Sequence, residues 1–341
     1  MIITVDAMGG DRFPDVPIDG ALLALQELPE DFSLELVGDE GVIKQYLQEK
    51  TYPEQRLTII HAQETVTMDE KVESAVRKRK SSIAVGLDRS ASEQSQAFIS
   101  AGNTAAVMAI SVLRLRLVKG IERPGIIVTL PTVADPCVIL DVGASVDCTP
   151  KQLAAFGVMG GIYAQHVLGI AQPRVALISI GEEPGKGNDA TRKTHELLQA
   201  LNQNHDMRFI GNIEGRDVLW GRADVIVTDG FTGNIMLKLA ESLIPSLNAI
   251  VKKIIRRGRW DQKVFAVLAK SIFLGPTIGA LKRTFDVELY GGAQLLGTNG
   301  TVIITHGKST SKAILNAIVV ARKAVQADVA GRIAEKLTKI A

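Results

Sequence analysis

Short turns rich in glycine, asparagine, threonine and aspartate follow many apolar runs of this sequence, and such turns can bind an anion. The turn Asp-Gly-Phe-Thr-Gly-Asn at 229–234 lies between the apolar run 224–228 and a helical pattern that starts at 235. Glycine lets backbone N–H groups approach a ligand closely, while Asn, Thr and Ser cap a helix or donate to an anion. Each turn alone is typical of an ordinary helix cap, but their number predicts a shared anionic ligand on one rim of the fold. Similar turns are found at 6–11, 100–104, 141–144, 181–188, 211–215 and 306–308.

The sequence offers few groups that could act as a protein nucleophile. It contains no G-x-S-x-G elbow, and its two cysteines, Cys137 and Cys148, are expected in a strand and in a loop. Only His306 among the histidines falls at an expected strand exit, so a histidine-activated nucleophile is hard to assemble. We therefore expect an enzyme whose substrates supply the nucleophile, such as inorganic phosphate attacking a thioester, while the protein supplies positioning and electrostatics.

One lysine could serve such a reaction. Lys186 stands in the glycine-rich turn 185–188, where its ammonium could neutralise a phosphate or a developing oxyanion; the alternative is a solvated loop lysine. The turn is not a Walker loop, because the pattern G-x-x-x-x-G-K-[ST] is absent. No G-x-G-x-x-G follows an expected strand, so nicotinamide chemistry has no support.

An alternation of apolar runs and helical patterns predicts the scaffold that positions these turns. The alternation favours one α/β unit with a largely parallel sheet, helices on both faces, and ligands beyond the carboxyl ends of the strands. Strands are expected at 2–5, 34–37, 57–60, 97–100, 125–129, 138–141, 175–180, 208–210, 225–228 and 301–305. Helices are expected at 14–28, 40–48, 104–119, 150–168, 188–202, 235–257 and 309–339.

The composition is that of a globular protein in a reducing compartment. Of 341 residues, 46% are hydrophobic and 22% charged, and the net charge of +2 with 4% aromatics gives no support for nucleic-acid binding. Two cysteines outside any Cys-x-x-Cys pair make a disulfide framework or a structural zinc site unexpected. The sequence begins without a basic leader, so we expect a cytoplasmic protein with no signal peptide, forming a single domain over 1–341.

The segment 242–285 differs from the rest of the chain in its charge. It carries nine basic residues and one acid, and its apolar residues between 264 and 274 follow helical spacing before Gly275-Pro276 interrupts it. This pattern predicts a protruding helical hairpin with basic edges and an apolar face. Such a hairpin could lie on an anionic membrane, attract an acidic protein, or pack in a dimer interface. A second basic run, Arg77-Lys-Arg-Lys80, is by default a solvated helix face.

Seven motifs in this order resemble the PlsX family, the bacterial phosphate acyltransferases of phospholipid synthesis. They are VDAMGGD (5–11), ISAGNT (99–104), ERPGI (122–126), LDVGASVD (140–147), IGNIEGRD (210–217), VTDGFTGN (227–234) and YGGAQLLG (290–297). The resemblance implies that long-chain acyl–acyl carrier protein and inorganic phosphate give acyl phosphate and free carrier protein. It also implies a Rossmann-like three-layer α/β/α fold, similar to phosphotransacetylases and isopropylmalate dehydrogenases, and a homodimer without metal or organic cofactor.

The resemblance also implies a site. Lys186 would neutralise the phosphate or the thioester oxyanion, Asn234 and Asn103 would donate hydrogen bonds to the same group, and Asp229 would orient donors. The remaining substrate and phosphate contacts would be Asp6, Gly9, Gly10, Asp11, Ser100, Gly102, Thr104, Gly187, Asn188, Gly230, Thr232 and Gly233. Contacts to the carrier protein or the membrane would come from Arg77, Lys78, Arg79, Lys263, Phe265, Leu268 and Phe273.

The resemblance also implies partners for the enzyme, and this chain departs from the family's motifs at three positions. The acyl phosphate would pass to a glycerol-3-phosphate acyltransferase, and the enzyme would associate peripherally with the inner face of the membrane. Arg12 stands where the family has histidine, Ala105 where it has glycine, and Ser145 where it has asparagine. Two alternatives remain. One is a short-chain phosphotransacetylase, which would have no use for the apolar segment. The other is a non-enzymatic membrane scaffold that recruits carrier protein, which would not need the anion-binding turns.

Overall fold

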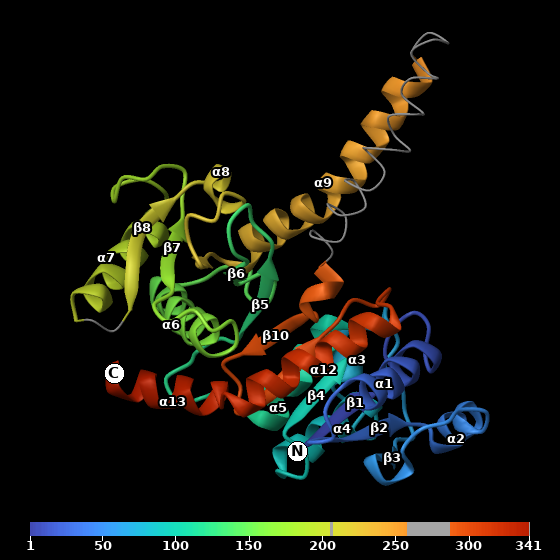
Figure 1. Cartoon of the computed structure of the whole chain (residues 1–341). Helices are drawn as coiled ribbons and strands as arrows, with labels where there is room; N and C mark the ends of the chain where they lie inside the picture. Colours follow the sequence, from blue (N-terminus) through green and yellow to red (C-terminus); the bar gives the residue numbers. More distant parts are fainter. Residues whose placement is uncertain (205–206, 258–286, 341) are drawn as a thin grey trace.

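The computed structural model describes residues 1–204, 207–257 and 287–340, and its centre is one eleven-stranded sheet (Figure 1). The strands lie in the order β3-β2-β1-β4-β11-β10-β5-β6-β9-β7-β8. Their bounds are β1 Ile2–Asp6, β2 Ser33–Gly38, β3 Leu57–His61, β4 Ala97–Ser100, β5 Gly125–Leu130, β6 Cys137–Leu140, β7 Arg174–Ile178, β8 Arg208–Ile213, β9 Val225–Val227, β10 Ala293–Leu296 and β11 Thr301–Ile304. The sequence predicts every one of these strands except β10.

Most pairings in the sheet are parallel, as predicted, but the strand direction reverses near its middle. The three antiparallel pairings are consecutive: β11 with β10, β10 with β5, and β5 with β6. Because three reversals follow one another, β6, β9, β7 and β8 run opposite to β3, β2, β1, β4 and β11. The polar turns therefore follow strands that run in two opposite directions. We call the carboxyl ends of β1 and β4, with the turns that follow them, the β1/β4 end. The carboxyl ends of β7 and β9, with their turns, are the β7/β9 end.

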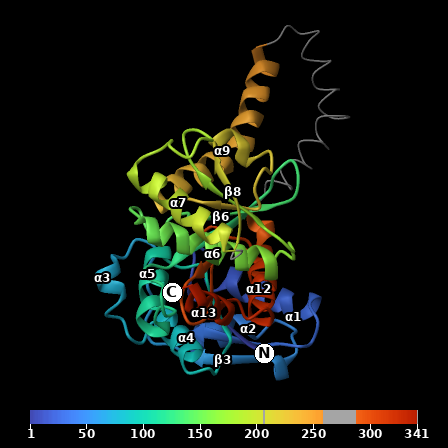
Figure 2. The same cartoon turned by 90° about the vertical axis from the view of Figure 1, so that its left-hand side faces the viewer.

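Helices cover both faces of the sheet, so the three predicted layers are present (Figures 1 and 2). Adjacent strand residues show the two faces: Ile99 of β4 packs in the cluster that contains α1 and α12, whereas Phe98 packs with α4 and α5. In β5, Ile127 packs with α6 and α13, and Ile126 joins the α4 and α5 cluster. The helices are α1 Asp15–Glu27, α2 Glu40–Leu47, α3 Val72–Ala75, α4 Ser82–Ala91, α5 Thr104–Leu115, α6 Pro150–His166, α7 Asp189–Gln203, α8 Gly215–Val218, α9 Gly230–Arg257, α12 Ser311–Gln326 and α13 Val329–Ile340.

The helix α9 extends away from the rest of the described chain (Figure 1). It continues to Arg257, so the amino-terminal part of the basic segment is helical, with Pro245 inside the helix. Apolar side chains on α9 are exposed at Phe231, Ile235, Leu239, Leu247 and Ile250. The predicted contacts Lys263, Phe265, Leu268 and Phe273 lie outside the described residues. Within the described ranges, no helix is both long enough and apolar enough to cross a bilayer.

Candidate functional site

Lys186 lies exposed in the turn that follows β7. Its backbone N–H donates to the carbonyl oxygen of Glu183 at 3.0 Å. Its aliphatic stem lies against Gly181, where a Cβ would meet the Lys186 Cγ at 2.8 Å. The turn passes directly into α7, which Asn188 caps by accepting a 2.8 Å hydrogen bond from the N–H of Thr191. In the part of the chain that the structure describes, the Lys186 ammonium has no hydrogen-bond or ion-pair partner, so it is available to an anion.

The 229–234 turn forms the first turn of α9 rather than a loop before it. The Asp229 Oδ1 accepts from the N–H of Thr232 at 2.7 Å, and the Asp229 carbonyl accepts from the N–H of Gly233 at 2.9 Å. Asp229 therefore caps the amino-terminal end of α9, where the helix dipole is positive. Asn234 is exposed, and no described protein group bonds to its side-chain amide.

Asp141, directly after β6, holds the turn on which α9 begins. Its buried carboxylate accepts four backbone hydrogen bonds of 2.7 to 3.1 Å, from Ile126, Gly143, Ala144 and Ser145. Burial raises the pKa of Asp141, and the four N–H groups act against that rise. The Ser145 carbonyl accepts from Gly230 at 2.8 Å, and a Cβ on Gly233 would lie 1.9 Å from the Asp141 carbonyl oxygen. The start of α9 thus rests directly on the 141–145 turn, a contact that the sequence analysis missed.

At the β1/β4 end, Asp6 and Ser100 form a buried pair. The Ser100 hydroxyl donates to Asp6 Oδ2 at 2.7 Å and accepts from the N–H of Gly102 at 3.0 Å, while Asp6 Oδ1 accepts from the N–H of Met8 at 3.1 Å. Burial raises the pKa of Asp6, and its hydrogen bonds act in the opposite direction. A Cβ on Gly9 would lie 2.8 Å from both Asp6 Oδ2 and the Gly102 nitrogen. The pair therefore locks two turns together, and these polar groups bond to protein.

Asn103 also bonds to protein through its whole side chain. Its Nδ2 donates to the carbonyls of Met68 at 3.1 Å and Glu70 at 2.9 Å, and its Oδ1 caps α5 by accepting from the N–H of Ala106 at 3.1 Å. Asn103 thereby fastens the segment 64–81 to the β1/β4 end. Its role as a donor to substrate stays a prediction, and that role would require the release of one of these bonds.

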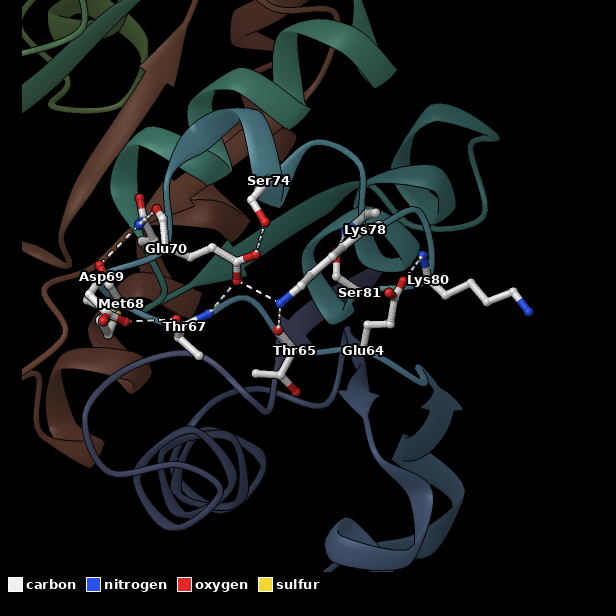
Figure 3. Close-up of polar contacts among 12 residues, drawn as sticks. Glu64, Thr65, Thr67, Met68, Asp69, Glu70, Ser74, Lys78, Lys80 and Ser81 are labelled. Atoms are coloured by element: carbon white, nitrogen blue, oxygen red, sulfur yellow. Dashed lines mark hydrogen bonds and ion pairs between the residues drawn. The ribbon is translucent and has the colours of Figure 1, made fainter.

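Glu70 is the centre of the segment 64–81 (Figure 3). Its carboxylate accepts from the Lys78 ammonium at 2.7 Å and from the Ser74 hydroxyl at 2.7 Å. The hydrogen bond from Lys78 is the main reason why the pKa of Glu70 is lowered. Lys78 thus ties the segment together internally, whereas Arg77 and Arg79 beside it are exposed.

The predicted site residues consequently form two groups. At the β1/β4 end lie Asp6, Gly9, Gly10, Asp11, Ser100, Gly102, Asn103 and Thr104. At the β7/β9 end lie Lys186, Gly187, Asn188, Asp229, Gly230, Thr232, Gly233 and Asn234. Among the described residues, no hydrogen bond or ion pair joins one group to the other. In the described part of the chain, Lys186, Thr232 and Asn234 at the β7/β9 end have side chains without a hydrogen-bond or ion-pair partner, and so do Asp11 and Thr104 at the β1/β4 end.

A cavity of about 380 Å³ lies at the opposite ends of β7 and β8, where these strands begin. His166, Arg208 and Arg332 line it together with parts of α6 and α13. It contains none of the predicted site residues. Across residues 1–204, 207–257 and 287–340, no group of three or more His, Cys, Asp or Glu side chains is arranged to hold a metal ion.

Comparison with known proteins shows full-length similarity to one kind of protein. A family model described as "Fatty acid synthesis protein" matches residues 1–332. A phosphate acyltransferase of Synechocystis sp. is 44% identical over 333 residues, which cover 97% of this chain and 92% of the relative. A phosphate acyltransferase of Dictyoglomus turgidum is 40% identical over 342 residues, which cover 100% of this chain and 98% of the relative.

Solved structures with a similar fold include phosphotransacetylases. The chain is similar to a phosphotransacetylase from Streptococcus pyogenes with a TM-score of 0.65 and 17% identity, over 96% of this chain and 94% of that chain. It is similar to the EutD phosphotransacetylase from Staphylococcus aureus with a TM-score of 0.61 and 15% identity, again over 96% and 94%. At such low identity the likeness shows the fold alone, and it confirms the expected relation to the phosphotransacetylase fold.

Proposed function

The chain belongs to the fatty acid synthesis protein family, and its relatives at 40% and 44% identity are phosphate acyltransferases. On this premise we propose the acyl donor, the acceptor and the products of its reaction. The donor is a long-chain acyl–acyl carrier protein, the acceptor is inorganic phosphate, and the products are acyl phosphate and free carrier protein. The acyl phosphate serves in turn as the acyl donor for a glycerol-3-phosphate acyltransferase of phospholipid synthesis.

The observation that carries this proposal is the pair Lys186 and Asn234 at the β7/β9 end. Both side chains are exposed, and neither has a partner among the described residues. They follow β7 and β9, which are parallel neighbours, so both belong to the same end of the sheet. An exposed cation in the turn after β7 and an exposed amide in the first turn of the 28-residue helix α9 are both groups that stabilise an anion.

The reaction needs no nucleophile from the protein. A phosphate oxygen attacks the thioester carbon, and the carbonyl oxygen becomes an oxyanion that Lys186 and Asn234 stabilise. The C–S bond then breaks, the new O–C bond remains in the acyl phosphate, and the carrier thiolate takes a proton from water. Asp229, which caps α9, keeps the Asn234 turn in place.

The exposed cations of the segment 64–81 support a docking place for the acidic carrier protein. Arg77 and Arg79 are exposed on either side of Lys78, whose ammonium is committed to Glu70. Carrier docking therefore uses the two arginines, and Lys78 keeps their segment folded. Because Asn103 fastens the same segment to the β1/β4 end, the docked carrier would lie beside the first group of turns.

The exposed apolar residues of α9 support a further contact, either with a second copy in a homodimer or with the inner face of the membrane. The two contacts are compatible, because the helix is long and exposes apolar side chains at both Phe231 and Ile250. In this proposal the enzyme works in the cytoplasm and delivers its acyl phosphate at the membrane surface.

A thiol-release assay tests the proposed substrates. Purified protein is mixed with palmitoyl-acyl carrier protein and inorganic phosphate, and release of the carrier thiol is followed; parallel reactions contain acetyl-CoA or omit phosphate. We expect phosphate-dependent release from the long-chain carrier substrate alone. Release from acetyl-CoA would favour the short-chain phosphotransacetylase, and binding of carrier protein without any release would favour the non-enzymatic scaffold.

A further inference from the structure

Two hydrogen bonds meet at the carbonyl oxygen of Glu183. The backbone N–H of Lys186 donates to it at 3.0 Å, and the side-chain Nδ2 of Asn212 donates to it at 3.0 Å. A carbonyl oxygen can only accept, so the Asn212 amide must turn its NH₂ group toward Glu183 and its Oδ1 away. The orientation of Asn212 is thus dictated by the turn that carries Lys186.

This orientation also decides where His195 carries its proton. The Nδ1 of His195 lies 2.9 Å from Asn212 Oδ1, and both residues are buried. Because the amide oxygen can only accept, His195 must be the donor and its proton must be on Nδ1. The bonds therefore run in one direction, from His195 to Asn212 to Glu183, and end at the carbonyl that also receives the Lys186 N–H.

The local structure holds each member of this chain of bonds. The pairing of β7 with β8 shifts register between Val175 and Leu177, and Gly211 has a φ of +95° at this irregularity. Bulges of this kind re-aim the side chain that follows, here Asn212. The ring of His195 is fixed by an edge contact with Phe209 at a centroid distance of 5.1 Å.

We propose that His195 and Asn212 are positioning residues for Lys186. Through Glu183 they hold the turn 183–186 in the shape that presents the Lys186 ammonium to phosphate and the thioester, while Asn188 fixes the far side of the turn as the cap of α7. This inference rests on the proposed function of Lys186. Neither His195 nor Asn212 touches the substrate; both act on the reaction through the lysine.

The test is a double-mutant cycle on acyl phosphate formation. In Asn212→Asp, one carboxylate oxygen still accepts from His195, but the other faces the Glu183 carbonyl and repels it, so the turn is released. We expect kcat to fall by roughly 10- to 100-fold in the otherwise native enzyme. In the Lys186→Ala background the same substitution should have no further effect, because there is no lysine left to position. Asn204→Asp, at the exposed end of α7, is the matched control and should leave kcat unchanged.

Each other outcome of the cycle is decisive. An equal loss of kcat in both backgrounds would mean a general structural role and would overturn this inference alone. Near-normal turnover of Lys186→Ala itself would overturn the proposed role of the lysine, and this inference with it.

A spectroscopic measurement keeps the inference falsifiable if Asn212→Asp does not fold. In ¹⁵N-histidine-labelled native protein, two-bond nitrogen–proton couplings should show His195 protonated on Nδ1, with its signals assigned from their absence in His195→Gln. Protonation on Nε2 with Nδ1 unprotonated would overturn the inference. Nδ1 of His195 and Oδ1 of Asn212 would then both be acceptors, and no hydrogen bond could form between them.

Discussion

The substitution Gly233→Ala tests whether the start of α9 must rest on the 141–145 turn. A Cβ at this position would lie 1.9 Å from the Asp141 carbonyl oxygen and 2.9 Å from the Thr228 Cγ2. The first of these neighbours is backbone, so it cannot be relieved by a side-chain rotation. The contact is relieved if the first turn of α9 moves, and Asn234 then moves with the helix.

The size of the effect follows from that contact. The separation of 1.9 Å must grow to at least 3.0 Å, which is a displacement of about 1.1 Å. A misplacement of roughly 1 Å in a group that stabilises the transition state costs on the order of 10²-fold in rate. Overpacking of this kind also costs about 1–3 kcal/mol of stability. With an unfolding entropy of about 0.7 kcal/mol per kelvin for a chain of this length, we expect Tm to fall by roughly 1.5–4 °C.

The assay is the phosphate-dependent release of carrier thiol from palmitoyl-acyl carrier protein, together with thermal unfolding followed by circular dichroism. The matched control is Gly215→Ala, because a Cβ there meets no atom within 4 Å. We expect kcat to fall in Gly233→Ala, Tm to fall slightly, and both to stay native in Gly215→Ala. A Gly233→Ala enzyme with native kcat and native Tm would refute the role given to this contact.

Two further predictions concern stability and docking. Burial acts to raise the pKa of Asp224, but the hydrogen bonds and charge of Arg174 outweigh it and hold the pKa below its ordinary value of 3.8. The pair therefore stabilises the fold above about pH 4 and loses this contribution as the pH falls through the lowered pKa. Asp224→Asn should cost on the order of 1–3 kcal/mol at pH 7, with a difference in Tm from the native protein that shrinks in acid; a constant difference would contradict the pairing. The double substitution Arg77→Glu/Arg79→Glu should raise KM for the acyl carrier substrate several-fold at low salt and leave kcat unchanged, whereas Lys78→Gln should lower Tm; an unchanged KM in the double variant would exclude docking there.

Local patterns in the sequence predict most of the elements, because strand burial and helix periodicity are local properties. The predicted helix at 309–339 is an instructive failure. It is interrupted between α12 and α13, where Asp328 has a φ of +47° and its Oδ1 accepts from the N–H of Gly331 at 3.2 Å. Both halves have helical periodicity, so the pattern alone does not show a break that one aspartate creates.

The direction of the strands was not predictable in the same way. The strand β10 is short, follows Gly291 and Gly292, and pairs antiparallel on both sides. Alternating β and α elements favour a parallel sheet. The sequence of residues 293–296 contains no pattern that indicates an antiparallel strand between parallel ones. The reversal of strand direction between the two groups of candidate turns was therefore not predicted.

Residue types pointed to Lys186 and Asn234 as available polar groups, but not to the residues that hold them. Asp141 and Asn212 stood inside quoted motifs, yet their roles depend on contacts that only the fold creates. Asp141 accepts from Ile126 in the neighbouring strand, and Asn212 reaches the Glu183 carbonyl 29 positions away. Such pairings depend on the register between neighbouring strands, which the sequence of a single segment does not determine.

The most direct measurement follows labelled inorganic phosphate into acyl phosphate, with palmitoyl-acyl carrier protein as donor, in the native enzyme and in Lys186→Ala. We expect label in the acyl phosphate of the native enzyme and a fall in kcat/KM of roughly 10²- to 10³-fold in the variant, the usual cost of losing one group that stabilises an oxyanion. Asn204→Asp serves as the control for folding and handling. Native turnover in Lys186→Ala would contradict a reaction centred on the β7/β9 end, and absence of label in the native product would contradict phosphate as the acceptor.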